Sequence, residues 1–290
     1  MSTRQRRLII TGDDFGLAEP VNEAIERAYR AGTLSTATLL VCGPAAADAV
    51  ARARRNPGLR VGLHLAVCEA RPALPASPLS NAAGELPAPL IALLKWLLPA
   101  YRGPLEAEIR AQFEAFARTG LVLDHVTGHN HMQLHPVVLP ILLRVAREYG
   151  SPPLRLPFEP LWASLRAARG WRLPFRFPWL VMAPWSRYVK WRMRRAGFTC
   201  NDYVFGIYDC GHLDLDRWLR IIAALPVGVS EIHCHPATQR CSELTRTMPS
   251  YAHAAELEAL LSPQLLAALA RADIQQLSGH SIWVGSISFL

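Results

Sequence analysis

Three apolar residues precede two adjacent carboxylates in the stretch Leu8-Ile9-Ile10-Thr11-Gly12-Asp13-Asp14-Phe15-Gly16. The apolar run is bounded by turn-forming residues, which predicts a buried strand. Neighbouring carboxylates at a strand end repel each other unless a cation or a shared proton relieves the repulsion. They also point in different directions, so one of Asp13 and Asp14 can hold a metal while the other faces a reacting water. An Asx-turn followed by a helix N-cap is the structural alternative, and these residues alone fit both interpretations equally.

Strand and helix signals alternate after the two aspartates. Pro20 and Gly32 bound a helix, and strands are predicted over residues 34–41 and 59–67 with an Ala-rich helix between them. This alternation favours an α/β fold with a parallel sheet and right-handed crossovers. The rest of the chain predicts strands over 121–126, 154–156, 229–234 and 282–287, and helices over 91–98, 105–118, 137–149, 254–261 and 263–272. We expect a single domain spanning residues 1–290.

The composition is that of a folded protein, with 290 residues of which 51% are hydrophobic. The six cysteines are scattered without a CxxC pair, and the basic N-terminus precedes only three apolar residues, which does not fit a signal peptide. The longest apolar stretch, residues 86–98, contains two prolines and a lysine and is too short to span a bilayer. We therefore expect reduced thiols and a cytoplasmic location.

The net charge of +8 is concentrated in one segment. Residues 155–198 contain ten Lys and Arg against the single acid Glu159, together with five of the eight tryptophans. We interpret residues 155–200, approximately, as a basic, aromatic-rich insert. Tryptophan and cations together suit a membrane interface, so peripheral contact with the inner membrane is the working hypothesis. A solvated loop over a helix pair with core aromatics is the alternative, and nucleic acid is not expected because the charge is confined to this segment.

Histidines follow the other predicted strands. His64 lies in the third strand, His129 and His131 follow the strand over 121–126, and His235 follows the strand over 229–234. Ligands and catalytic groups gather at the carboxyl ends of parallel strands, so these residues can converge with the Asp pair. One carboxylate and two neutral imidazoles make a three-ligand metal site that leaves room for water. Taken singly, His64 fits a core residue, His235 fits a turn cap, and at least one of the clustered histidines is expected to be structural.

Four motifs together resemble the YdjC/ChbG-like carbohydrate deacetylases. They are Thr11 to Leu17, Val61-Gly62-Leu63-His64-Leu65, Gly128 to Pro136 and Ile232 to Ala237, which occur in the family's order over nearly the whole chain. The resemblance implies a variant (β/α) barrel of the glycoside hydrolase/deacetylase type and metal-dependent removal of an N-acetyl group from an amino sugar. It assigns Asp13 as the base, His235 as the general acid, and Asp14, His64 and His129 as ligands of one divalent ion, either Zn²⁺ or Mg²⁺.

One motif departs from the chitooligosaccharide deacetylases of the family. Their usual Asp-Ser-His-His-His-Val-His is replaced by Thr127-Gly128-His129-Asn130-His131-Met132-Gln133. This form is similar to the hopanoid-biosynthesis-associated branch (HpnK), which implies deacetylation of an N-acetylglucosaminyl group on a bacteriohopanetetrol lipid. We expect Arg155 and His131 to contact the substrate. The alternatives are a deacetylase of soluble N-acetylated oligosaccharides and a catalytically inactive glycolipid-binding protein, and the oligomeric state stays open.

Overall fold

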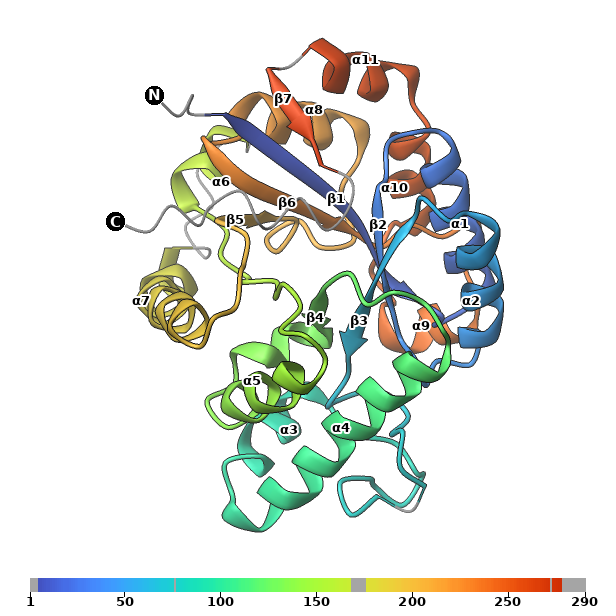
Figure 1. The fold of residues 1–290 in the computed structure, drawn as a ribbon. Helices are drawn as coiled ribbons and strands as arrows, with labels where there is room; N and C mark the ends of the chain where they lie inside the picture. Colours follow the sequence, from blue (N-terminus) through green and yellow to red (C-terminus); the bar gives the residue numbers. More distant parts are fainter. Residues whose placement is uncertain (1–4, 76, 168–175, 272, 278–290) are drawn as a thin grey trace.

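Strand β1 (Arg6–Phe15) lies at the centre of a parallel sheet in the computed structural model, which describes residues 5–75, 77–167, 176–271 and 273–277. The strand order is β4-β3-β2-β1-β6-β5, and β7 also pairs with β1 (Figure 1). The other strands are β2 (Thr36–Leu39), β3 (Arg60–Leu65), β4 (Val126–Gly128), β5 (Tyr203–Phe205), β6 (Gly228–Cys234) and β7 (Ile274–Gln276). All the pairings among these strands are parallel, as the alternation of strand and helix signals predicts.

The sheet curls, and isolated bridges link its two edges. Val126 of β4 pairs with Leu154, and Leu154 pairs with Cys200 shortly before β5. The short strand predicted over 154–156 is thus a single bridging residue. The curled parallel sheet with helices around it confirms the predicted variant (β/α) barrel.

Helices surround the sheet because each crossover between parallel strands carries at least one apolar helical face back over it. In α1, for example, Val21, Ile25 and Ala28 are buried at helical spacing. The helices are α1 (Glu19–Arg30), α2 (Ala46–Arg55), α3 (Pro89–Lys95), α4 (Arg102–Arg118), α5 (Val138–Glu148), α6 (Leu161–Ala167), α7 (Arg176–Arg195), α8 (Leu215–Ala224), α9 (Ser242–Thr247), α10 (His253–Leu260) and α11 (Pro263–Arg271), with short 3₁₀ turns η1 (Pro99–Tyr101) and η2 (His129–Leu134). Among the described residues, no helix combines the length and the apolarity that a bilayer span needs.

One predicted strand is much shorter than expected, and another cannot be compared with the structure. The strand predicted over 121–126 begins only at Val126, although the backbone of Asp124 and His125 already bonds to β3. The strand predicted over 282–287 lies outside the described residues, and the final described strand is β7, which extends the sheet beside the start of β1.

The basic, aromatic-rich segment contains α6 and α7 in its described part. Val189 and Met193 of α7 are fully buried, whereas Tyr188 and Trp191 are 42% and 51% exposed. The segment therefore combines ordinary core packing with an exposed aromatic face. Its first cation, Arg155, is fully buried beside the sheet and does not belong to that face.

Candidate metal centre and catalytic site

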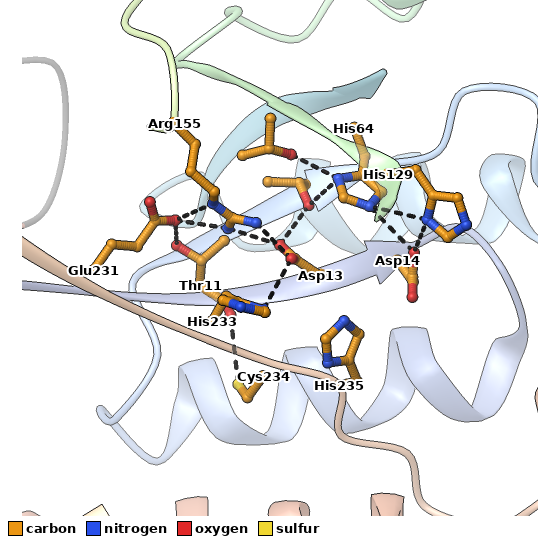
Figure 2. A network of polar contacts seen from close by, with 12 residues as sticks. Thr11, Asp13, Asp14, His64, His129, Arg155, Glu231, His233, Cys234 and His235 are labelled. Atoms are coloured by element: carbon orange, nitrogen blue, oxygen red, sulfur yellow. Dashed lines mark hydrogen bonds and ion pairs between the residues drawn. The ribbon is translucent and has the colours of Figure 1, made fainter. Parts of the chain in front are cut away.

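An irregularity at the end of β1 turns the side chains of both aspartates towards one site. The register between β1 and β2 shifts between Gly12 and Phe15, and Asp14 has a φ of 61°, in the left-handed region that Asp tolerates better than most residues. In a regular strand, adjacent side chains point to opposite faces, and a bulge re-aims them. Figure 2 shows the carboxylates of Asp13 and Asp14 near the histidines at the ends of the neighbouring strands.

Three predicted metal ligands form a nearly equilateral triangle of ligand atoms. Asp14 Oδ1 lies 3.3 Å from His64 Nε2 and 3.3 Å from His129 Nδ1, and the two nitrogens are 3.4 Å apart (Figure 2). Tetrahedral bonds of about 2.0–2.1 Å place neighbouring ligand atoms about 3.3–3.4 Å apart. Octahedral bonds of similar length place them closer, at about 3.0 Å. The triangle therefore matches one face of a tetrahedral site.

Hydroxyl groups fix how His64 presents its ring. Thr127 Oγ1 of β4 lies 2.6 Å from His64 Nδ1, and Thr38 Oγ1 of β2 lies 3.2 Å from the same nitrogen. A threonine that accepts the Nδ1 proton leaves the lone pair of Nε2 free to face Asp14 and His129. Such partners orient a ligating imidazole and hold its tautomer.

The charges around the triangle fit a divalent cation. Four charged side chains cluster here with exposed fractions of 2% or less, namely Asp13, Asp14, Glu231 and Arg155. Three carboxylates and one guanidinium leave a net charge of −2, which a buried site does not tolerate without a counter-charge. Burial opposes a charged ring at His129, yet the carboxylate of Asp14 raises the pKa of that ring, so the site attracts positive charge.

Asp13 is held by a buried arginine. Arg155 donates from Nη1 to Asp13 Oδ2 at 2.6 Å and from Nη2 to Asp13 Oδ1 at 2.8 Å, and the hydroxyl of Thr38 donates to Oδ1 at 2.9 Å. The same guanidinium donates from Nε and Nη2 to Glu231 Oε1, which also accepts from Thr11 Oγ1. Burial opposes the charge on Asp13, but Arg155, together with His233 and His64, outweighs it and holds the pKa of Asp13 well below its usual range.

This geometry corrects the predicted role of Arg155. Its side chain is fully buried and its donors are directed at Asp13 and Glu231, so it offers no surface to a substrate. Its position instead fixes the orientation of Asp13. The cause of the error is that a cation near a strand end looks the same in sequence whether it faces the cleft or the interior.

His235 and His131 each lie against the ring of His233 at the end of β6. The backbone N–H of His235 donates to Glu256 Oε2 at 2.6 Å, and its carbonyl lies 2.6 Å from Nδ1 of His253. Burial lowers the pKa of His235 to about 4 despite the nearby Asp14, so the ring is neutral before any reaction. His131 stacks edge-on against His233, and burial also lowers its pKa well below the usual value.

A cleft of about 210 Å³ opens beside the predicted metal ligands. Its lining includes His64 and His129, together with Gln112, Glu69 and Arg71. Apolar side chains from the loop after β2 and polar ones from α9 complete the wall. A small cleft with both polar and apolar lining residues suits a small polar group with an apolar portion.

Sequence reasoning missed several supporting residues. Glu231 had a signal, because an acid inside the otherwise uncharged strand over 229–234 requires a buried partner. Thr38 and Thr127 had none, since threonine is common in strands for packing reasons alone. His135, which lies in the same motif as His129, is structural: Nε2 lies 3.0 Å from the carbonyl oxygen of Leu93, and Nδ1 accepts from the backbone at the start of α5.

The fold and the site together define a class, a (β/α) barrel with residues for one metal ion at the carboxyl ends of its parallel strands. The family described as YdjC-like protein matches residues 7–271, and the chain belongs to this family. It is 31% identical to a carbohydrate deacetylase of Geobacillus stearothermophilus over 271 residues, which cover 93% of this chain and 95% of the relative. A carbohydrate deacetylase of Brevibacillus brevis is 30% identical over 89% of this chain and 92% of its own length.

A solved structure supports the fold. The crystal structure of a putative cellobiose-phosphate cleavage protein from Enterococcus faecalis V583 matches with a TM-score of 0.74 and 23% identity, covering 96% of this chain and 99% of that one. This likeness extends over the whole barrel and shows the fold alone.

Proposed function

We propose that this protein is a metal-dependent carbohydrate N-deacetylase. The observation that carries the proposal is the triangle formed by Asp14, His64 and His129, with the second carboxylate of Asp13 held beside it. A bound divalent ion would polarise the acetyl carbonyl and lower the pKa of a water molecule. The two relatives named carbohydrate deacetylase, which align over most of this chain, support the same reaction class.

Asp13 is proposed to take the proton of the attacking water. Arg155 and Thr38 fix both of its oxygens, so a water held at the triangle meets a carboxylate that is already oriented and charged. His235 is proposed to pass a proton to the departing sugar amine. Because burial keeps its ring neutral, His235 has to gain that proton during the reaction, and the proton that Asp13 takes from the water balances the step.

We propose Zn²⁺ as the metal ion. Two nitrogens and one carboxylate oxygen suit Zn²⁺, and the 3.3–3.4 Å edges of the triangle match tetrahedral better than octahedral ligation. Metal analysis of the purified protein tests this choice. Deacetylase activity that depends on Mg²⁺ in protein without bound zinc would contradict it.

For the substrate, we propose an N-acetylglucosaminyl hopanoid lipid. The Gly128 to Pro136 motif supports this choice, and so does the surface around it. Helix α3 and the following turn expose apolar side chains at 44–71%, namely Leu90, Ile91, Leu93, Leu94, Leu97 and Leu98. A cluster of this size on a surface is typical of a membrane or partner contact.

This apolar surface lies close to the turn that carries His129. On one side, the carbonyl oxygen of Leu93 in α3 lies 3.0 Å from His135 at the end of η2. On the other, Trp185 of α7 donates to the carbonyl oxygen of Leu134 at 2.9 Å. Further along α7, the guanidinium of Arg195 lies over the exposed ring of Trp191. Leucines, aromatics and cations therefore flank the proposed reaction centre, as a peripheral enzyme on an anionic bilayer requires.

Comparing acetate release from a synthetic N-acetylglucosaminyl hopanoid with release from a soluble chitooligosaccharide tests the substrate. Faster turnover of the hopanoid supports the proposal, and faster turnover of the oligosaccharide would favour the soluble alternative.

Asp13→Asn should keep the metal and lose turnover, whereas His64→Ala should lose both. If Asp13→Asn hydrolysed the substrate at the wild-type rate, the assignment of Asp13 as the base would be wrong. Purified wild-type protein that contains no metal and binds glycolipid without hydrolysing it would indicate an inactive binding protein.

Vesicle flotation tests the proposed membrane contact. Leu94→Gln/Leu97→Gln should reduce recovery with phosphatidylglycerol-containing vesicles severalfold, because each substitution removes an exposed apolar side chain from the contact. Val122→Gln is the matched control, since Val122 is 76% exposed but precedes β4 at the opposite end of the barrel from the metal ligands. Equal recovery of wild type and both variants would contradict the assigned surface.

A further inference from the structure

A second group of soft ligand atoms lies beside the first. Cys210, His233 and His235 place a sulfur and two ring nitrogens within 4.8 Å of one another, and none of the three belongs to the Asp14 triangle. His233 and His235 come from the carboxyl end of β6, and Cys210 comes from the loop between β5 and α8. Figure 2 shows the two histidine rings below the aspartates, on the side away from His64.

The spacing of these atoms is close to that of a bound zinc site. Cys210 Sγ lies 3.8 Å from His235 Nδ1. Tetrahedral Zn²⁺ with a thiolate at about 2.3 Å and an imidazole at about 2.0 Å sets sulfur and nitrogen about 3.5 Å apart. A shift of a few tenths of an ångström at the cysteine would satisfy this distance, and Cys210 lies on a loop, where such a shift is easier than in a strand.

His233 supplies an independent sign of a missing partner. Its side chain is 2% exposed, and Nε2 is buried without a hydrogen-bond partner among the described residues. Within the described part of the chain, Nδ1 reaches Asp13 Oδ2 alone, at an ion-pair distance of 3.4 Å. Buried ring nitrogens usually have partners, and unsatisfied ones are often found where an ion or a water binds.

The local field also favours a cation. Burial raises the pKa of the Cys210 thiol to about 12, and the carboxylates of Glu256, Asp13 and Asp14 add to that effect. The negative potential that disfavours a thiolate attracts positive charge. The hydroxyl of Tyr251 donates to Cys210 Sγ at 2.9 Å, which would stabilise the thiolate once a metal has displaced its proton.

We propose that Cys210, His233 and His235 form a second, soft-metal site that binds Zn²⁺ in excess of the first equivalent. Binding forms one bond from zinc to sulfur and two to nitrogen, and it releases the thiol proton to solvent. The second ion binds more weakly than the first, because the first ion already balances the net charge of −2. Since zinc occupies a ring nitrogen of His235, excess zinc should inhibit the enzyme; this consequence rests on the proposed function, whereas the binding does not.

Equilibrium dialysis and cobalt titration test the binding without any substrate. Wild-type protein should bind two Zn²⁺, and Co²⁺ at the second site should give the near-ultraviolet charge-transfer absorption of a thiolate ligand. Cys210→Ser should lose that absorption and weaken the second site at least about tenfold. Cys42→Ser, which changes a cysteine that lines the cleft, should keep both, and His64→Ala should lose the first ion but keep the absorption.

A measurement on the wild type covers the case in which Cys210→Ser does not fold. Zinc should protect Cys210 from alkylation by iodoacetamide, as read by peptide mass spectrometry, and should leave Cys42 as reactive as before. A single bound zinc, an absorption that persists in Cys210→Ser, or no protection of Cys210 would overturn the proposed site.

The inhibition is tested separately. Each protein's rate in tenfold excess zinc is divided by its own rate at one equivalent, and this ratio should fall severalfold in wild type and stay near one in Cys210→Ser. Equal inhibition of both proteins would overturn the link between the second site and inhibition. If no acetylated sugar is turned over at all, the proposed deacetylase function fails, while the dialysis and cobalt results still decide the second site.

Discussion

Replacing Arg155 by methionine should cost much of the stability of this protein. The substitution keeps an unbranched side chain of similar length but removes the guanidinium that bonds both Asp13 and Glu231. These two carboxylates are 2% and 1% exposed, so neither can turn to solvent when the cation is lost. Two buried charges would then face each other near Asp14, without an arginine or lysine partner among the described residues.

The magnitude follows from the burial. Breaking a buried ion pair by removing one partner costs about 3–5 kcal/mol, because the other charge stays buried and uncompensated. We expect a loss of this size in the free energy of unfolding, towards its upper end because two carboxylates are stranded. Glu231→Gln removes one of them, so the double variant should lose about 1–3 kcal/mol less than the sum of the single losses.

Urea unfolding followed by tryptophan fluorescence at pH 7 measures these differences. Arg144→Met is the matched control, because Arg144 is an exposed arginine whose partner Glu106 is also at the surface, and such pairs contribute about 0–1 kcal/mol. A loss below about 1 kcal/mol in Arg155→Met, or losses that simply add in the double variant, would refute the assigned role of Arg155.

Three further predictions follow from particular residues. Burial raises the pKa of Glu159 to about 7, so between the unfolded pKa near 4.5 and pH 7 the native state holds a proton that the unfolded chain has lost. The free energy of unfolding should therefore fall by up to about 3 kcal/mol as the pH rises over that range, and Glu159→Gln should flatten this slope in urea titrations. Thr127→Val removes the hydroxyl 2.6 Å from His64 Nδ1 and should weaken metal affinity about 10–100-fold in a chelator competition. An unchanged affinity would show that this contact does not support metal binding. Gly43→Ala would place Cβ 2.2 Å from the carbonyl oxygen of Gly16 and should destabilise the fold by more than about 2 kcal/mol in thermal unfolding. Gly103→Ala, at a helical position where Cβ meets nothing within 4 Å, should stabilise the fold by up to about 1 kcal/mol in the same assay.

The site shows which properties a local sequence pattern carries. The predicted residues Asp13, Asp14, His64, His129 and His235 do lie together, because each follows or ends a strand and parallel strands deliver their carboxyl ends to one edge. The roles given to them remain predictions. The basic segment was harder to interpret, because residues such as Val189 and Tyr188 have similar sequence surroundings yet one is buried and the other exposed.

By itself, the sequence determined the alternation of strands and helices, the parallel sheet and the family, because hydrophobic period and contiguous motifs are local properties of the chain. Only the tertiary structure decided that Arg155 faces inward onto Asp13, that three ligand atoms lie 3.3–3.4 Å apart, and that Cys210 lies near His233 of β6 and His235 just after it. These depend on the register between strands that are distant in sequence and on the bulge at the end of β1, which turns side chains by amounts that no local pattern encodes.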